Sequence, residues 1–437
     1  MLLIYLQNKI TNISITLKLR IITTFMILGF SSLQSQNDTP NILFIIGDDM
    51  GVDALSTYNI GNLNANTPNL DALGNSGIKF TNVWAAPVCS ATRASLITGK
   101  YGIHNGVNTV PGQLSTSHKS IFKEIKTQSN DLYKTCVIGK WHLARRNNYN
   151  HPFEHGVDDF MGVFNAGVKD YYQWEKYENS KVETCNTYAT QYFTDYAIDW
   201  IKKQDQPWFM WLAHVAPHAP FQKPPNGTYN TENVNTNTGK YRAMIESLDY
   251  EIGRLLKNIP KKTLKNTVIV FLGDNGTPGR MVSGFPLRKG KGTVYQGGIN
   301  VPLLISGKGV RRKNTEEDAL INISDFYATF SQMVNPNVFP NNIYSDGISF
   351  KHLLNNSNAK ERTYNFMSLG VNRRIKTTAY TVRNAQYKLI DNGESYEFYD
   401  LVADPFELKN LAEGDLNITQ QQAKTELTST LIEIRGT

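Results

Sequence analysis

The stretch "PNILFIIGDDMG", residues 40–51, decides the fold class of this chain. Its middle is a short, unbroken apolar run that leads directly into two carboxylates, Asp48 and Asp49, and then a glycine. Such a run, without alternation of apolar and polar residues, is typical of a parallel strand buried on both faces. We therefore expect a central strand that delivers both carboxylates at its carboxyl end.

A second stretch has the same form. In "NTVIVFLGDNG", residues 266–276, an apolar run ends in Asp274 and Asn275. Ligands of open α/β sheets bind beyond the carboxyl ends of the strands, so two strand ends far apart in sequence can converge there. An Asp-Asn-Gly triplet is also an ordinary turn sequence, and it is the repetition at two strand ends that favours a metal site. Asp48, Asp49, Asp274 and Asn275 offer hard oxygen ligands, which suit Ca²⁺ or Mg²⁺ rather than zinc.

Apolar strands alternate with amphipathic helices over most of the chain. Further strands are expected at residues 134–139 and 207–214, and helices at 67–77 and 188–204. This alternation predicts an α/β fold with a mostly parallel central sheet sandwiched by helices.

The chain changes character after about residue 345. The segment 378–401 alternates like an antiparallel hairpin, with Asn392-Gly393 as its turn, and we expect a helix after it. We therefore predict a catalytic domain over residues 36–345 and a smaller α+β subdomain over 346–437.

The composition limits the partners. The 437 residues are 40% hydrophobic and 19% charged, as in an ordinary globular protein, and the net charge is +7 with a pI near 9.0. This excess favours anionic partners such as acidic polysaccharide, although an ordinary solvated surface can also have it. No basic helix or zinc-knuckle spacing indicates nucleic-acid binding.

The amino terminus reads as a secretory signal peptide over residues 1–35. Basic residues precede the apolar run "IITTFMILGF" (21–30), and "SSLQSQ" (31–36) follows it. The run is too short to cross a bilayer, so we expect cleavage near Ser35 and no membrane anchor. The mature protein is then exported to the periplasm or secreted.

One of the three cysteines precedes a helix-like run. In "VCSATRASLITGK" (88–100), Cys89 would lie at a helix N-terminus, where the dipole favours negative charge, and Arg93 would share its face. A disulfide between Cys136 and Cys185 would leave Cys89 free. A lone cysteine is most often a small buried hydrophobe, so its surroundings must decide its role.

Three loops would bring cations and imidazoles to the same edge of the sheet. The side chains are Lys140 and His142 in "GKWH", His214 and His218 in "HVAPHAPFQKPP", and Lys289 and Lys291 in "LRKGKGTVYQGG". Each loop alone reads as solvent-facing. Together with a metal and an activated residue they are the groups that cleave an anionic ester.

Eight stretches, in this order, resemble the type I sulfatases of the alkaline phosphatase superfamily. They are "PNILFIIGDDMG", "TPNLDALGNSGIKFTN", "CSATRASLITGKY", "GKWHL", "PHAPF", "GDNG", "GKGTVYQGG" and "YDLVADPFELKNL". Each is weakly specific, but the ordered set covers almost the whole mature chain. The resemblance implies an alkaline phosphatase-like fold and sulfuric ester hydrolase activity.

In that family a formylglycine-generating enzyme oxidises the motif's cysteine during export, and the hydrated aldehyde is the nucleophile. The resemblance places formylglycine on Cys89. It also implies one Ca²⁺, rather than Mg²⁺, held by Asp48, Asp49, Asp274 and Asn275 and touched by the modified Cys89.

The resemblance implies roles for the remaining site residues. Arg93 and Lys140 would steady the formylglycine and the sulfate, and His142 would help to release sulfate from the hemiacetal. His218 and Lys291 would bind sulfate and assist the leaving alcohol, and we place His214 beside them in substrate binding. The chain departs from the family at Ala91, where a proline is usual, and at Gln296, where a glutamate is usual.

We therefore predict an exported sulfatase that acts on a sulfated carbohydrate, such as the marine algal polysaccharide ulvan. Two alternatives stay open: a phosphodiesterase or phosphonate monoester hydrolase of the same superfamily, and a non-catalytic binder of anionic glycans. The aromatic segment "DYYQWEKYEN" (170–179) either lines a sugar site or belongs to the core.

Overall fold

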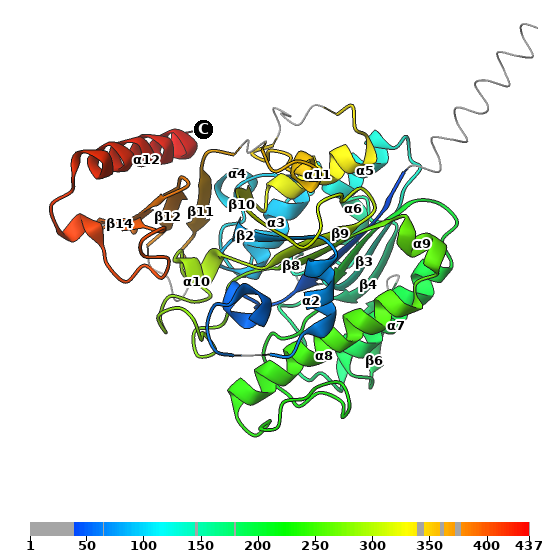
Figure 1. Cartoon of the computed structure of the whole chain (residues 1–437). Coiled ribbons are helices and arrows are strands. Elements are labelled where there is room, and N and C mark those ends of the chain that lie inside the picture. Colours follow the sequence, from blue (N-terminus) through cyan, green and yellow to red (C-terminus); the bar gives the residue numbers. More distant parts are fainter. Residues whose placement is uncertain are drawn as a thin grey trace, which may run out of the picture. The chain divides into compact units, whose positions relative to one another are not determined.

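The apolar run 41–47 forms strand β1 (Asn41–Gly47), in the interior of a ten-stranded sheet (Figure 1). Alternate side chains of β1 enter two separate cores. Phe44 and Ile46 pack on one face of the sheet, whereas Leu43 and Ile45 pack on the other. Because both faces are covered, the strand has no polar side, and the expectation of a doubly buried strand is confirmed.

The computed structural model describes residues 39–63, 65–144, 147–178, 181–338, 345–358, 362–371 and 377–436. The predicted signal peptide over residues 1–35 and its cleavage near Ser35 lie outside the described residues. No described helix combines the length and the apolar character needed to cross a bilayer.

The strand order shows where the sheet is parallel. Strands β8, β1, β7, β3 and β4 are mutually parallel, which confirms the predicted parallel centre. Strand β9 runs antiparallel to both β8 and β2, and β5 and β6 form an antiparallel edge. The order is β10 (Thr315–Asn322), β2 (Ile78–Trp84), β9 (Leu303–Gly307), β8 (Thr267–Gly273), β1, β7 (Trp208–Ala213), β3 (Lys134–Lys140), β4 (Asp159–Val163), β5 (Trp174–Glu178) and β6 (Lys181–Cys185).

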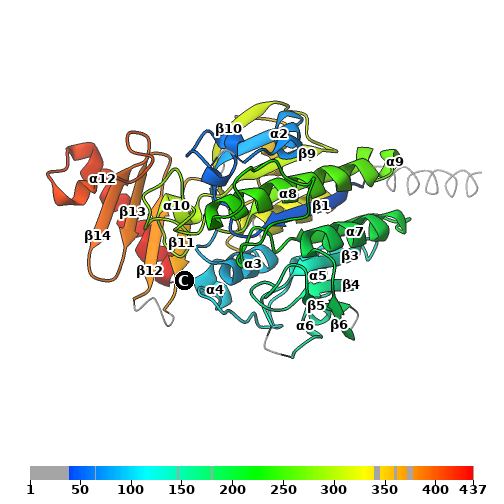
Figure 2. The same cartoon turned by 90° about the horizontal axis from the view of Figure 1, so that it is seen from below.

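Helices cover both faces of this sheet (Figure 2). The first core contains side chains of α3 (Cys89–Thr98), α5 (Ile121–Gln128) and α11 (Asp325–Val334). The second contains side chains of α2 (Pro68–Asn75), α7 (Ala189–Lys202) and α8 (Asn237–Asn258). The shorter helices are α4 (Gly102–Asn105), α6 (His151–Glu154), α9 (Lys261–Lys265) and α10 (Gln296–Ile299), with 3₁₀ turns η1 (Val52–Ala54), η2 (Ser56–Tyr58), η3 (Lys351–Leu354) and η4 (Leu411–Glu413).

A four-stranded antiparallel sheet follows. Its order is β11 (Asn365–Leu369), β12 (Ala379–Arg383), β13 (Tyr387–Asp391) and β14 (Tyr396–Asp400), and α12 (Ile418–Gly436) packs on it through a third core. The turn at Asn392-Gly393 joins β13 to β14, with Gly393 at φ +86°, as the hairpin signal predicted. The domain boundary placed at residue 345 stays a prediction.

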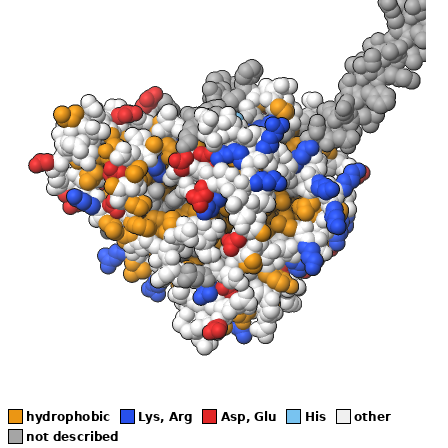
Figure 3. Space-filling view, viewed as in Figure 1, with side chains coloured by type: hydrophobic (Ala, Val, Ile, Leu, Met, Phe, Trp, Pro, Cys, Tyr) orange, Lys and Arg blue, Asp and Glu red, His pale blue; other side chains and the backbone are white. Residues whose placement is uncertain are grey.

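Basic side chains are unevenly spread over the surface. Figure 3 shows lysine and arginine side chains gathered near α9, on the right of that view. Helix α9 contributes exposed lysines at Lys261, Lys262 and Lys265. On the face in view in Figure 3, basic side chains are therefore densest near α9.

Candidate active site

The carboxyl ends of β1 and β8 lie side by side, with Gly47 opposite Gly273. The backbone N–H of Asp49 donates to Asp274 Oδ1 at 3.1 Å, and Asn275 Nδ2 donates to Asp49 Oδ1 at 2.9 Å. These residues are more than 220 positions apart in sequence but form one buried acidic cluster. The convergence expected from the two apolar runs is thus present.

Two buried oxygens of the cluster lack partners. Asp48 Oδ1 and Asn275 Oδ1 accept no hydrogen bond from any described residue. Buried polar atoms are normally satisfied, and a carboxylate oxygen is especially costly to leave without a partner. The donor set consists of carboxylate and amide oxygens, which are the ligands that Ca²⁺ and Mg²⁺ prefer. Asp48, Asp49, Asp274 and Asn275 therefore fit a divalent cation.

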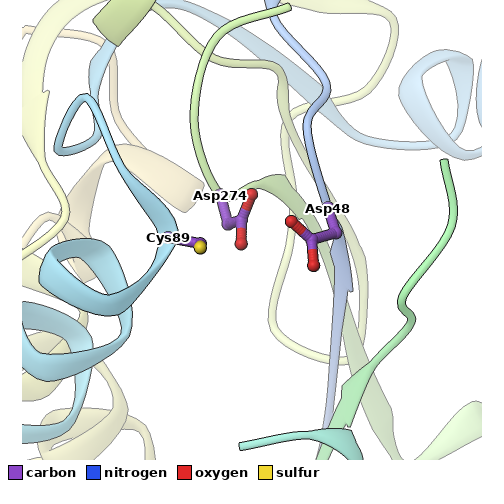
Figure 4. Close-up of side chains that lie close together, drawn as sticks. All are labelled: Asp48, Cys89 and Asp274. Atoms are coloured by element: carbon purple, nitrogen blue, oxygen red, sulfur yellow. The ribbon is translucent and has the colours of Figure 1, made fainter. Parts of the chain in front are cut away.

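Cys89 lies at the start of α3 and faces these carboxylates (Figure 4). Its Sγ and carboxylate oxygens of Asp48 and Asp274 all lie within 4.8 Å of one another. The side chain is buried, and burial raises the pKa of the Cys89 thiol, with the charges of Lys140 and Lys291 only partly opposing it. Because the thiolate is the reactive form, this environment is unfavourable for an unmodified cysteine nucleophile.

Two buried cations hold the carboxylates from the side of α3 and β3. Lys140 Nζ contacts Asp48 Oδ2 at 2.5 Å, and Arg93 Nη2 donates to Asp274 Oδ2 at 2.8 Å. Arg93 Nη1 also donates to the backbone oxygen of Lys140 at 2.6 Å, which ties the two elements together. Both cationic side chains are fully buried, which is rare for charged groups unless they are paired.

A lysine and a histidine lie against Asp49. Lys291 Nζ contacts Asp49 Oδ1, and His218 Nε2 lies 3.9 Å from Asp49 Oδ2. His218 Nδ1 donates to the backbone oxygen of Ala219 at 2.7 Å, which fixes the ring. Burial alone would raise the pKa of Asp49, but the charges of Lys291, His218 and Lys140 outweigh it and hold that pKa well below its usual range.

His142 contacts the sulfur of Cys89. Its Nδ1 lies 3.2 Å from Cys89 Sγ, and its backbone, two residues after the end of β3, has a positive φ of 58°. Burial, together with the charges of Lys140 and Arg93, holds the pKa of His142 well below 6.5. The imidazole is therefore neutral, and one ring nitrogen is available to accept a hydrogen bond from a group at position 89.

Two predicted residues lie in other surroundings. His214 is buried, and burial lowers its pKa to about 3, while its Nδ1 has no partner among the described residues. Lys289 Nζ contacts the backbone oxygen of Glu407 and lies 4.3 Å from the centre of the Tyr295 ring. Among the residues that the structure describes, neither pairs with the acidic cluster. A substrate-binding role for His214 stays a prediction.

Further residues that the sequence motifs do not include support the cluster. Tyr241 Oη donates to the backbone oxygen of Asp49 at 2.6 Å, and Thr277 Oγ1 donates to Asp53 Oδ1 at 2.6 Å. Tyr171 Oη donates to the backbone oxygens of Val215 and His218, at 2.8 and 2.7 Å. The signal for Tyr171 was the aromatic segment 170–179, but nothing in the sequence near Tyr241 or Thr277 indicated these contacts.

All three cysteines are free thiols in the structure. Strands β4 and β5 lie between β3, which carries Cys136, and β6, which carries Cys185. Three strand spacings of about 4.8 Å each exceed the reach of a disulfide. The pairing that the sequence left open is therefore not formed.

Two models of known protein families match this chain. A family model described as Sulfatase matches residues 40–336, from the start of β1 to just beyond α11. The chain belongs to the sulfatase family. A second family model, described as N-sulphoglucosamine sulphohydrolase, C-terminal, matches residues 289–436. The resemblance inferred from the eight sequence motifs is confirmed.

Two curated sulfatases are similar to this sulfatase-family chain in sequence. Arylsulfatase J of Mus musculus is 30% identical over 317 residues, which cover 66% of this chain and 52% of that protein. The ulvan-active sulfatase of Formosa agariphila is 28% identical over 440 residues, covering 92% of this chain and 83% of that protein. The chain spans about half to three fifths of the length of the first curated relatives it matches.

A solved structure confirms the expected fold. The crystal structure of Ps i-CgsB in complex with k-i-k-neocarrahexaose superposes with a TM-score of 0.78 at 22% identity, covering 91% of this chain and 93% of that chain. The ten-stranded sheet with helices on both faces and the smaller antiparallel sheet are thus an alkaline phosphatase-like sulfatase fold.

Proposed function

We propose that this sulfatase-family protein hydrolyses sulfate esters of a sulfated carbohydrate, releasing the free hydroxyl and sulfate. One observation carries the proposal: Cys89 Sγ and the carboxylates of Asp48 and Asp274 lie within 4.8 Å of one another. The helix N-terminus at Cys89 and the surrounding cations make this point suitable for an anionic ester. The similarity to the ulvan-active sulfatase along 92% of the chain supports an algal polysaccharide such as ulvan.

Two groups complete the proposed site. Cys89, oxidised to formylglycine by a maturation enzyme, would supply a hydroxyl nucleophile at the place of the thiol. One Ca²⁺ held by Asp48, Asp49, Asp274 and Asn275 would supply positive charge for the sulfate oxygens. The two orphaned buried oxygens, Asp48 Oδ1 and Asn275 Oδ1, support this ligand set.

The proposed role of each remaining site residue follows from its position. His142, neutral and 3.2 Å from Sγ, would accept a proton from the group at position 89. Arg93 and Lys140 would hold that group and the sulfate in place. His218 and Lys291, which lie against Asp49, would bind sulfate and donate to the leaving oxygen. Positive charge fixed before the reaction stabilises the transition state without reorganisation.

The deciding experiment compares 4-nitrophenyl sulfate with bis(4-nitrophenyl) phosphate as substrates. The protein is expressed with its own N-terminal segment, the predicted signal peptide. We expect turnover of the sulfate ester, with Cys89→Ala reducing it at least ~1,000-fold, since no other nucleophile occupies that position. Peptide mass spectrometry should find formylglycine at residue 89, in the periplasmic or secreted fraction. A strong preference for the phosphate diester would make the protein a phosphodiesterase, and an active, unoxidised thiol would refute the formylglycine.

A further inference from the structure

A cleft opens directly beside His218. One cavity of about 780 Å³ is lined by His218 and by the segment that precedes β5, and a second of about 420 Å³ adjoins it. The two adjoin along the same residues, Asn165, Gly167, Val168, Lys169, Glu175 and Tyr177. We call the two cavities together the hairpin cleft, because the β5–β6 hairpin contributes to the lining of both. Volumes of about 300–1,000 Å³ are typical of sites that bury small organic ligands.

The hairpin cleft begins at the reacting centre. His218 itself lines the larger cavity, and it lies so close to Gly167 that a Cβ placed on this glycine would be 3.1 Å from His218 Nδ1. The other ring nitrogen, Nε2, lies 3.9 Å from Asp49 Oδ2. A sulfate ester whose sulfur lies at the acidic cluster, with its leaving oxygen near His218, would therefore extend its sugar into the cleft.

The lining suits a sugar that carries charge. Tyr149, Phe164 and Tyr177 form a wall in which ring centroids lie 4.6 to 5.4 Å apart, and such apolar faces are common in ligand sites. Polar side chains with exposed ends, among them Asn165, lie around this wall. The segment 170–179 thus contributes both core residues and cleft residues.

Lys169 is the cation in this lining. It is exposed and forms no ion pair or hydrogen bond with any described residue, whereas nearby Lys176 is paired with both Glu178 and Glu183. Glu175 lines the same cleft and is likewise without a partner among the described residues. The cleft therefore holds one unpaired positive and one unpaired negative side chain. Lys169 would attract an anionic ligand, and Glu175 would repel it.

We propose that the hairpin cleft binds the sugar that bears the sulfate ester, and that Lys169 pairs with a second anionic group on the same oligosaccharide. That group is a uronate carboxylate or another sulfate, which present the same charge to the lysine. The inference rests on the proposed function and specifies its substrate class as a doubly charged saccharide. Glu175 opposes the second charge, so the two side chains tune affinity in opposite directions.

The test uses Lys169→Gln, Glu175→Gln and, as a matched control, Lys202→Gln, which removes an exposed lysine at the end of α7. Four substrates separate the contributions: 4-nitrophenyl sulfate, a neutral monosulfated disaccharide, the same disaccharide with a uronic acid, and the same with a second sulfate. We expect Lys169→Gln to raise KM about 2- to 5-fold for one or both charged disaccharides, with kcat unchanged. Glu175→Gln should lower that KM, and added salt should reduce both effects.

The pattern of results identifies the anion and can refute the proposal. A KM effect confined to the uronate or to the disulfated substrate identifies which group Lys169 binds. An equal effect on the neutral disaccharide, or no effect beyond that of Lys202→Gln, overturns the inference. Calorimetric titration with the desulfated uronate disaccharide gives a readout without turnover. If wild-type protein cleaves no sulfate ester but this binding weakens in Lys169→Gln, the proposed function fails while the cleft assignment stands.

Discussion

At the scale of single residues, two unsatisfied oxygens are the most informative atoms of the site. Asp48 Oδ1 and Asn275 Oδ1 are buried at adjacent strand ends and lack partners among the described residues. An unsatisfied buried polar atom costs about 1–3 kcal/mol, so without an ion the cluster is destabilised. A divalent cation that binds only the folded chain would reverse that cost and add its own binding free energy.

Removal of the metal should therefore lower stability as well as activity. We expect a chelator to decrease the melting temperature, and Ca²⁺ at about 100 times its Kd to restore about 2.7 kcal/mol of unfolding free energy. Differential scanning calorimetry with and without Ca²⁺ measures this change. Asp48→Asn should abolish the response, and Asp199→Asn, an exposed acid on α7, should retain it. A wild-type melting temperature that ignores the chelator would contradict the metal site.

The sequence predicted most of the cluster because the end of each strand fixes the position of the residue that follows it. Asp48, Asp274 and Lys140 end or directly follow buried parallel strands, so their meeting place follows from the fold. His214 also follows such a strand, β7, but its buried Nδ1 forms no hydrogen bond with a described residue. The direction of a side chain in an irregular loop depends on tertiary packing, which residue spacing does not reveal.

At the scale of elements, the loop that carries Lys291 is held by the second sheet. Glu407 Oε2 accepts from the backbone N–H of Gln296 at 2.6 Å, and Lys388 Nζ on β13 donates to Glu407 Oε1 and to the backbone oxygen of Val294. The Lys388–Glu407 pair is fully buried. Burial lowers the pKa of Lys388 to about 8 although Glu407 opposes the shift. The pair thus fixes the glycine-rich loop through its backbone.

Glu407→Gln should weaken both the fold and the reaction. It leaves the Lys388 charge buried without a counterion, which typically costs about 3–5 kcal/mol. It also loosens the loop that positions Lys291, so kcat should fall. Urea unfolding and 4-nitrophenyl sulfate turnover measure the two effects.

The matched control is Glu413→Gln, which changes an exposed acid in η4. The double variant Lys388→Met with Glu407→Gln should recover part of the stability, because it removes the unpaired charge. Unchanged turnover in Glu407→Gln would show that the pair does not position the loop.

The elements that the sequence did not predict share a physical cause. β5 and β6 form a sheet edge, and most residues of β6 are exposed, so they lack the apolar run that marked the central strands. The antiparallel direction of β9 is set by its pairing with β8 and β2, which lie far away in sequence. Edge strands and strand directions depend on these long-range pairings rather than on local composition.

At the scale of the whole molecule, His104 links three segments. Its Nδ1 contacts Asp346 at 2.8 Å, and its Nε2 lies 3.2 Å from the backbone oxygen of Ile434 in the last turn of α12. The hydrogen bond with Asp346 raises the pKa of His104 above 6.5, although partial burial opposes the shift. The charged form of His104 therefore stabilises the native chain.

Stability should then depend on pH in a defined direction. The folded pKa lies above the unfolded value, so the contribution of about 1 kcal/mol is complete below pH ~6.5 and is lost as pH rises through the folded pKa. Thermal melts between about pH 5.5 and 8.5 should show this decline in wild type. His104→Asn and Asp346→Asn should each flatten it. An unchanged slope in both variants would exclude this pair as its source.

The sequence predicted the layers of the molecule better than the side-chain contacts that connect its parts. The parallel centre, the helices on both faces and the Asn392-Gly393 hairpin follow from local patterns. The contacts of Lys388, Glu407 and His104 that connect the C-terminal sheet and α12 to the rest do not, because each joins segments far apart in sequence. Residues 41–437 form one compact unit.

The burial of Cys89 also limits when during folding its side chain can be modified. Its side chain is only 2% exposed, beneath carboxylates that reach it from strands β1 and β8. Strand β8 ends at Gly273, so the sheet can close over the thiol only after more than half of the chain has emerged. If Cys89 is converted to formylglycine as proposed, the oxidising enzyme would have to reach it before that closure. Maturation and folding would then compete, and slower folding should leave a larger fraction of the chains oxidised.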